Sequence, residues 1–261
     1  MFNMNIRRMI KSISILLLVG YVGMGVFLYL YQRDFLYHPT ANIPTPYKTL
    51  TLHNNGESIN VIVLNEGHEN AILYFGGNAE SMAQSSDYIA GQFPNFTVYL
   101  MDYRGFGGST GVPTEESIYL DALTLYDAIK PKHTLVSIGG RSLGTGVATY
   151  VAAHRSVSKL ALITPYDSIV NVAQERYPLY PVSLLLKDRY DSLSRIKNIT
   201  AKTFIVMAQN DQVIPLERTQ KLIDAFSKEQ LEIEIIKNKG HMDISSDASY
   251  YRLMQDFIGE G

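Results

Sequence analysis

"IGGRSLGTG", residues 138–146, is the stretch of sequence on which the interpretation of this chain depends. It contains Gly140-x-Ser142-x-Gly144, a pattern typical of a sharp strand-to-helix turn that presents a nucleophilic serine. A second stretch, "GFGGSTG" at residues 105–111, repeats the pattern around Ser109. Because glycine makes up about 7% of residues, a chain of this length contains the pattern by chance roughly 0.1 times. The surrounding sequence therefore has to decide between the two serines.

Only Ser142 has a strand before it and a helix directly after it. The apolar run "TLVSIGG" leads into it, and "LGTGVATYVAAH" leaves it with the composition of a helix. The strand before Ser109 is expected to end near Asp102, and Pro113 and Thr114 open the next helix only after the serine has passed. We therefore predict the nucleophile at Ser142 and interpret the stretch around Ser109 as a loop that folds back over the sheet edge.

The rest of the chain alternates between strand-like and helix-like segments. Two strand-like runs flank Asn54-Asn55-Gly56, which predicts a hairpin. Near-continuous apolar runs then alternate with helical stretches, as expected for a mostly parallel central sheet with helices on both faces. The expected strands are 71–77, 96–105, 133–140, 159–165, 202–210 and 231–238, and the clearest helices are 114–130, 143–154, 216–228 and 246–258. Ligands of such sheets bind at the carboxyl ends of the strands.

Partners for a serine nucleophile occur at two of these strand ends. Asp211 lies in "MAQNDQVIP" and His241 in "KNKGHMD", each directly after a predicted strand. The order Ser, Asp, His is the one that hydrolases of this architecture use. We predict Asp211 as the acid and His241 as the base, with Asp167, after the strand 159–165, as the rival acid.

Hydrolysis through a tetrahedral intermediate also requires hydrogen-bond donors for the oxyanion. One donor is expected to be the backbone N–H of Leu143, the residue after the nucleophile. The second should come from the loop "YFGGNAES", where glycines let the backbone bend toward the site and Asn78 offers its N–H. A plain glycine turn explains that loop equally well from the sequence alone.

The N-terminal region reads as a membrane anchor. The uncharged run from Ile13 to Tyr31 is close to the ~20 residues that cross a bilayer as a helix. Arg7, Arg8 and Lys11 precede it, so the N-terminus is expected in the cytoplasm, with the catalytic domain on the opposite side in a single-pass arrangement. The alternative is a cleaved signal peptide. We thus expect an anchor and its flank at 1–37, a proline-spaced linker at 38–47 and a catalytic domain at 48–261.

The composition excludes several other functions. The 261 residues carry a formal net charge of −2, which gives no reason to expect a nucleic-acid partner. The chain has no cysteine, which excludes disulfides, thiolate catalysis and cysteine-based zinc sites. The sequence also lacks an HExxH metal motif, a Walker A lysine and a GxGxxG after a strand. We therefore expect neither a metal nor a cofactor.

At the level of longer motifs, the chain resembles the alpha/beta-hydrolase superfamily, and within it the Bem46/ABHD13-like and ABHD17-like membrane-associated serine hydrolases. The resemblance rests on "GGNAE", "DYRGFGGSTGVPTEESIYLDA", "GRSLGTGVA", "TPYDSI", "YPVSLLLKDRYDS", "NDQVIP" and "GHMDI", in that order. It implies Ser142 as nucleophile, Asp211 as acid, His241 as base, and oxyanion donation from the backbone of Asn78 and Leu143. Relatives typically have histidine before Gly-Asn-Ala, where this chain has Gly76, so the shape of the oxyanion loop is open.

The sequence therefore predicts a serine hydrolase that cleaves carboxylic esters or thioesters through an acyl-enzyme intermediate. The expected substrate is a small-molecule, lipid or acyl-protein ester. A serine peptidase on the same fold and a non-catalytic binding protein are the alternatives. The stretch "YPLYPVSLLL" at 177–186 is apolar enough to line an acyl pocket or to lie on a membrane, although it is equally compatible with the core.

Overall fold

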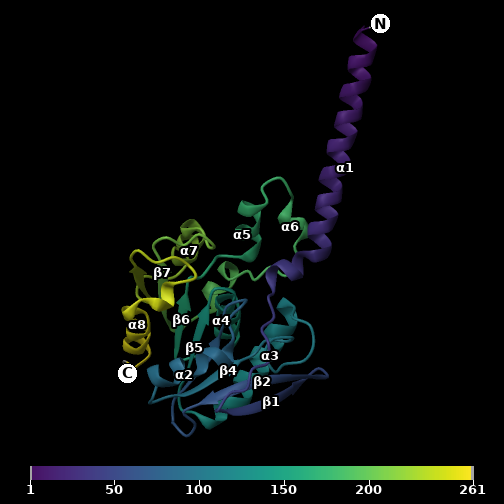
Figure 1. The fold of residues 1–261 in the computed structure, drawn as a ribbon. Coiled ribbons are helices and arrows are strands. Elements are labelled where there is room, and N and C mark those ends of the chain that lie inside the picture. The colour runs from purple at the N-terminus through teal and green to yellow at the C-terminus, as the bar shows by residue number, and fades with distance from the viewer. Residues whose placement is uncertain (1, 260–261) are drawn as a thin grey trace.

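A computed structural model describes residues 2–259 of the chain. Its centre is an eight-stranded sheet with the order β1-β2-β4-β3-β5-β6-β7-β8 (Figure 1). Strand β2 runs antiparallel to both of its neighbours, β1 and β4, and all other neighbouring strands pair in parallel. The strands are β1 (Lys48–Asn54), β2 (Glu57–Leu64), β3 (Ala71–Phe75), β4 (Thr97–Met101), β5 (Val136–Arg141), β6 (Lys159–Ile163), β7 (Lys202–Ala208) and β8 (Leu231–Ile236).

Helices cover both faces of the sheet (Figure 1). One apolar core joins the sheet to α3, α4 and α7, and a second joins its other face to α2 and α8. The bounds are α1 (Phe2–Leu36), α2 (Met82–Gln92), α3 (Glu115–Ile129), α4 (Leu143–His154), α5 (Ile169–Arg176), α6 (Val182–Leu185), α7 (Leu216–Ile223) and α8 (Ala248–Gly259). The predicted fold, a mostly parallel sheet of the alpha/beta-hydrolase type with helices on both faces, is confirmed.

The predicted hairpin forms between β1 and β2. Asn54 pairs with Glu57, which leaves Asn55 and Gly56 as a two-residue loop. Both have positive φ angles, 49° and 81°, which is the conformation that matches the twist of the flanking strands. Asparagine and glycine are the residues that adopt it most easily.

Several element ends differ from the sequence expectation. The strand expected at 96–105 ends at Met101, because Gly105 and Gly107 adopt positive φ angles and turn the chain away. The strand expected at 133–140 begins only at Val136, after a 3-10 turn at Lys130–Lys132. Helices α2, α5 and α6, which span 11, 8 and 4 residues, were not expected from the sequence.

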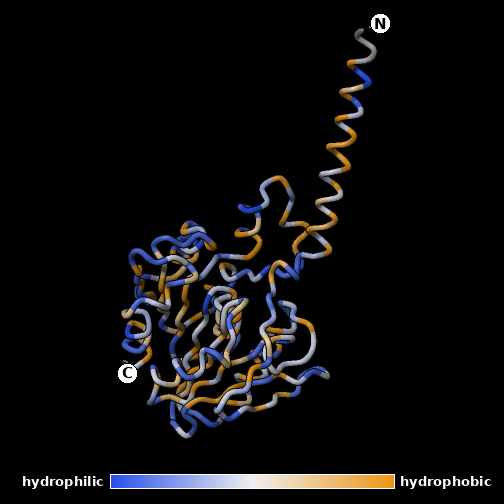
Figure 2. The backbone as a smooth tube through the Cα atoms, viewed as in Figure 1, coloured by the Kyte–Doolittle hydropathy of each residue, from blue (hydrophilic) through white to orange (hydrophobic). Residues whose placement is uncertain are grey.

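Helix α1 runs from Phe2 to Leu36, well beyond the apolar run from Ile13 to Tyr31. The flanks contain good helix formers and no proline, so nothing stops the helix at either end of that run. By length and composition its segment Ile6–Leu36 can cross a membrane, and an 18-residue window within it has a mean hydropathy of 2.3. The helix projects away from the sheet, and Figure 2 shows polar residues near its N-terminus followed by a long hydrophobic stretch.

Candidate active site

Ser142 lies on the sharp turn between β5 and α4. Its backbone angles are φ 49° and ψ −119°, a conformation that L-residues rarely adopt and that stores strain. The turn is possible because its neighbours are small. A Cβ at Gly140 would come within 2.6 Å of the carbonyl oxygen of Gly144, and one at Gly144 within 2.1 Å of that of Phe75. The two glycines of the motif therefore let strand, turn and helix approach closely enough to lift the hydroxyl above the sheet.

Two further predicted residues meet this hydroxyl. The Nε2 atom of His241 lies 2.8 Å from the Oγ of Ser142, and its Nδ1 lies 2.8 Å from the Oδ2 of Asp211. A carboxylate can only accept, so Asp211 places the proton on Nδ1 and leaves Nε2 free to accept from the serine. The side chains of His241 and Asp211 are only 7% and 3% exposed. The arrangement is a continuous hydrogen-bonded line from acid to base to hydroxyl.

The backbone after β7 fixes the carboxylate. The Oδ1 atom of Asp211 accepts hydrogen bonds from the N–H groups of Val213 and Ile214, at 2.9 and 2.8 Å. One oxygen is thereby held by the chain and the other points at the histidine. Such anchoring sets the orientation of the imidazole before any substrate binds.

The two predicted oxyanion donors lie on either side of Ser142. Leu143 is the first residue of α4, and Asn78 lies in the loop after β3. Within residues 2–259, neither backbone N–H has a hydrogen-bond partner. A Cβ built on Gly77 would lie 3.8 Å from the Cβ of Ser142, so the loop passes directly beside the serine. Two free donors next to a hydroxyl are what a tetrahedral intermediate requires.

Glu80, which the sequence analysis did not single out, holds this loop in shape. Its carboxylate accepts hydrogen bonds from the N–H of Gly77 at 3.0 Å and from the hydroxyl of Tyr74 at 3.2 Å. Burial raises the pKa of Tyr74 well above its usual value, which keeps the phenol protonated as a donor. The carboxylate also lies 3.7 Å from Arg141, whose guanidinium donates to the carbonyl of His241 at 3.3 Å. Glu80 and Arg141 thus connect the oxyanion loop to the histidine.

Gly76 is the position at which the family resemblance led us to expect a histidine. A Cβ at this position would lie 2.4 Å from the Cε of Met82, so the methionine fills the space. The hydroxyl of Tyr103 donates to the carbonyl of Gly76 at 2.8 Å. The loop therefore keeps a defined path without the histidine, because the methionine, the tyrosine and Glu80 support it.

The rival residues lie elsewhere. The hydroxyl of Ser109 is buried, donates to the carbonyl of Asp102 and accepts from the N–H of Asn60, both at 2.8 Å. Asp167 is fully buried, accepts from the N–H of Ser168 at the start of α5 and faces Arg218 at 3.3 Å. Both residues stabilise loops, and neither contacts His241. No cluster of three or more metal-ligating side chains occurs within residues 2–259.

Comparisons with known proteins agree with the fold. No protein-family model matches the chain. It is 26% identical over 255 residues to an uncharacterized protein of Mycobacterium tuberculosis, with 89% of each chain covered. It is 27% identical over 195 residues to human alpha/beta hydrolase domain-containing protein 17B, covering 72% of this chain and 66% of that protein.

Among solved structures, an esterase of Pyrococcus furiosus superposes with a TM-score of 0.68 at 15% identity, covering 85% of this chain and 95% of the esterase. An identity this low supports the fold alone. The sheet order, the strand-to-helix turn at Ser142 and the similarity to the human protein agree with one another. Together with the structural neighbours they support the alpha/beta-hydrolase superfamily, with ABHD17-like proteins among the relatives of this chain.

Proposed function

We propose that this protein is a serine hydrolase that cleaves carboxylic esters or thioesters through an acyl-enzyme. The observation that carries the proposal is the line from Asp211 through His241 to Ser142, with both hydrogen bonds at 2.8 Å. A serine hydroxyl is a weak nucleophile by itself, and a base aligned by an acid is the arrangement that activates it. The fold and the relatives support the broader class of hydrolase.

In the proposed mechanism, the Oγ of Ser142 attacks the acyl carbon while Nε2 of His241 takes its proton. The N–H groups of Asn78 and Leu143 stabilise the negative charge that develops on the acyl oxygen. His241 then returns the proton to the leaving alcohol or thiol, and the C–O or C–S bond breaks. In the second half, His241 deprotonates a water molecule, which attacks the acyl-enzyme and regenerates Ser142.

The N-terminal helix supports a membrane-bound arrangement of the enzyme. We propose that residues 1–37 form the anchor and its flank and that residues 48–261 form the catalytic domain. The basic residues precede the apolar run, so the positive-inside rule places the N-terminus in the cytoplasm and the catalytic domain on the other side. The full-length protein should remain with membranes after a carbonate wash. An intact mass lacking the first ~25 residues would instead identify a cleaved signal peptide.

A substrate panel tests the proposed reaction. Purified full-length protein is assayed on acyl esters and acyl thioesters of increasing chain length and on dipeptide amides, with Ser142→Ala as the blank. Turnover of esters or thioesters that the blank lacks is the expected result. Cleavage of the amides alone would identify a peptidase. No turnover of any member by the wild type would favour a binding protein on the same fold.

A further inference from the structure

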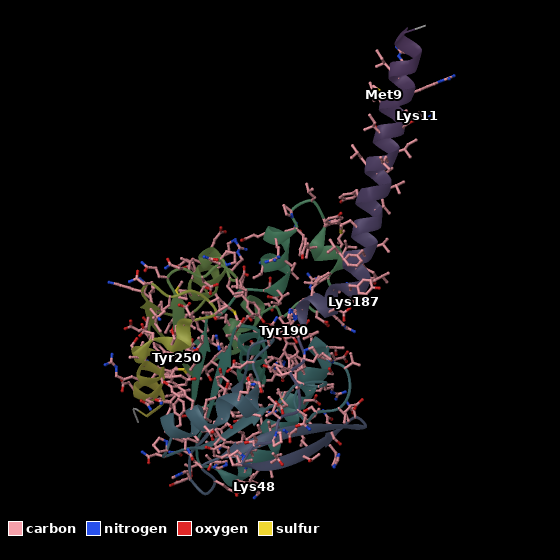
Figure 3. All side chains as sticks on the ribbon, in the orientation of Figure 1. Met9, Lys11, Lys48, Lys187, Tyr190 and Tyr250 are labelled. Carbon is pink, nitrogen blue, oxygen red and sulfur yellow. The ribbon has the colours of Figure 1, made fainter. Side chains whose placement is uncertain are left out.

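The segment between α5 and β7 lies against the membrane helix. The ring of Tyr180 stacks on the ring of Tyr21 at 4.7 Å, and the Tyr21 hydroxyl donates to the carbonyl of Leu179 at 2.7 Å. Near the base of the helix, Arg33 pairs with the carboxylate of Asp188 at 2.7 Å. The segment 177–188, which we call the cap, therefore runs along α1 instead of covering the sheet. Figure 1 shows α6 beside the lower half of α1, and Figure 3 places Lys187 next to its base.

The position of these contacts along α1 determines the depth of the cap. Tyr21 lies twelve residues before Arg33, which corresponds to about 18 Å along the helix axis. A span that begins after Lys11 and uses the ~20 residues needed to cross a bilayer ends near Tyr31. Tyr21 is then close to the middle of that span. Moving the bilayer toward the N-terminus would bury Arg7, Arg8 and Lys11 in hydrocarbon, which is costly.

Several backbone groups of the cap are satisfied by other groups of the protein. Two of its residues are prolines, which have no N–H, and side chains of α1 and α5 satisfy groups on either side of α6. Gln32 donates to the carbonyl of Leu185 at 3.3 Å and accepts from the N–H of Lys187 at 2.7 Å. On the other side, Gln174 donates to the carbonyl of Tyr180 at 3.0 Å. Irregular backbone is tolerated at membrane depth only where protein groups satisfy it in this way.

The outer surface of the cap is apolar and has basic residues at both ends. Leu179 and Leu184 are 77% and 82% exposed, the highest values among the large apolar side chains of the described chain. Figure 2 shows hydrophobic residues at α6 beside the hydrophobic stretch of α1. Arg176, Lys187 and Arg189 are exposed at the ends of the segment. Exposed apolar side chains beside a helix that spans a bilayer fit insertion of the cap into the lipid.

We propose that the cap, with Leu179 and Leu184 on its exposed surface, is inserted into the lipid leaflet beside α1, so that the enzyme takes its acyl substrate from the lipid phase. The inference rests on the proposed membrane-bound hydrolase and names its substrate class as an ester or thioester with a membrane-dissolved acyl chain. The oxyanion loop lies at the base of the same helix. The side-chain amide of Asn78 donates to the carbonyl of Leu36 at 3.1 Å, and the backbone carbonyl of Asn78 accepts from the N–H of His38 at 3.1 Å.

Tryptophan fluorescence tests the insertion directly, because the chain contains no tryptophan. Full-length Leu179→Trp and Leu184→Trp are reconstituted in phosphatidylcholine/phosphatidylglycerol vesicles with or without brominated acyl chains. The matched control is Leu135→Trp, an exposed leucine before β5, at the edge of the sheet opposite Ser142. We expect blue-shifted emission from the two cap variants and strong quenching by the brominated lipid, with the control unshifted and unquenched.

The outcomes separate the inference from the proposed function. If the protein floats with the vesicles but the cap variants behave like Leu135→Trp, the insertion is wrong while the anchor stands. A blue shift without quenching would place the leucines against protein, such as a second copy, and would also overturn it. Failure of the full-length protein to float would overturn both anchor and insertion. None of these measurements depends on catalysis, so an absence of ester turnover would count only against the proposed reaction.

A paired activity measurement tests the substrate class. The double variant Leu179→Asp/Leu184→Asp leaves α1 and the candidate active site untouched. Its turnover of a soluble short-chain ester should equal that of the wild type, and its turnover of a long-chain acyl ester carried in the same vesicles should fall. An equal loss on both substrates, or no loss on either, would contradict supply of the acyl chain through the cap.

Discussion

The chain contains the same five-residue pattern twice, in regions with opposite structures. Around Ser142 the pattern joins a strand to a helix, the serine has φ 49°, and its hydroxyl faces a histidine. Around Ser109 it forms a loop, and the buried hydroxyl bonds two backbone groups of β2 and of the end of β4. In the first region the glycines let backbones approach, while in the second Gly105, Gly107 and Gly111 supply positive φ angles.

The difference shows that the pattern by itself specifies only small residues beside a serine. The segments before and after the pattern determine whether the serine is exposed on a turn or buried in a loop. A strand that ends one residue before the serine, with a helix starting one residue after, forces the turn and exposes the hydroxyl. In a loop, the hydroxyl of Ser109 can point inward, where it bridges the N–H of Asn60 and the carbonyl of Asp102 in place of a direct hydrogen bond between these two groups. The following predictions test whether the two regions differ in this way.

Removing each hydroxyl should give the largest contrast. Ser142→Ala should lower kcat on a soluble ester by on the order of 10⁵- to 10⁶-fold with unchanged thermal stability, because the nucleophile is lost. Ser109→Ala should retain kcat and lower stability by about 1–3 kcal/mol, because the N–H of Asn60 loses its acceptor. Initial rates and thermal unfolding of both variants decide. A folded Ser109→Ala variant that has lost its activity would contradict the structural role assigned to Ser109.

The second-largest contrast is expected between Asp211 and Asp167, the two aspartates that follow strands, when each is replaced by asparagine. Asp211→Asn should leave the fold intact and lower kcat by on the order of 10⁴-fold, because the histidine loses the acceptor that fixes its tautomer. Asp167→Asn removes the buried carboxylate opposite Arg218, so it should act on stability and have little effect on kcat of the folded enzyme. Steady-state kinetics with calorimetry compares them. The reverse ranking would place the acid after β6.

Adding a methyl group to one glycine in each region should affect stability unequally. In Gly144→Ala the new Cβ would meet the carbonyl oxygen of Phe75 at 2.1 Å, and neither backbone can move, so we expect a loss of about 3 kcal/mol or more. In Gly111→Ala the Cβ meets the flexible side chain of Glu57, and the positive φ should cost only about 1–2 kcal/mol. Urea unfolding measures both. Equal losses in the free energy of unfolding would mean that the turn at Ser142 has room for a Cβ at residue 144.

The smallest effect is expected from the support of the oxyanion loop. Glu80→Gln weakens the contacts to Gly77 and Arg141, so kcat should fall roughly 10- to 100-fold through misplacement of the Asn78 donor. KM should change little, and thermal unfolding should match that of the wild type, because a smaller folded fraction would also lower the apparent kcat at unchanged KM. Glu66→Gln, an exposed carboxylate that pairs with Lys48, is the matched control and should behave as the wild type. An unchanged kcat in Glu80→Gln would show that the loop needs no such support.

The fold and the meeting of Ser142, Asp211 and His241 could be anticipated from local signals. Each of these residues lies within five residues after the end of a strand, and the carboxyl ends of parallel strands share one edge of the sheet. The strand after Asn55-Gly56 was equally predictable, because the turn type and the residues match. Features that depend on residues close together in the sequence could therefore be predicted from the sequence alone.

Contacts between distant segments could not be anticipated. Nothing in the sequence indicates that Glu80 meets Arg141, since glutamate and arginine are common and 61 positions separate the two. The pairing of Arg33 with Asp188 is likewise a product of how the cap packs against α1. The Met82 side chain that fills the space beside Gly76 is visible only once the loop has a shape.

Labelling with a fluorophosphonate tests the central assignment most directly, because only an activated serine attacks phosphorus rapidly. The full-length protein is treated with the probe, digested, and the adduct is located by mass spectrometry. The account predicts one rapid adduct on Ser142, which disappears in Ser142→Ala and persists in Ser109→Ala. An adduct on Ser109, or no adduct on any serine of the folded protein, would contradict it.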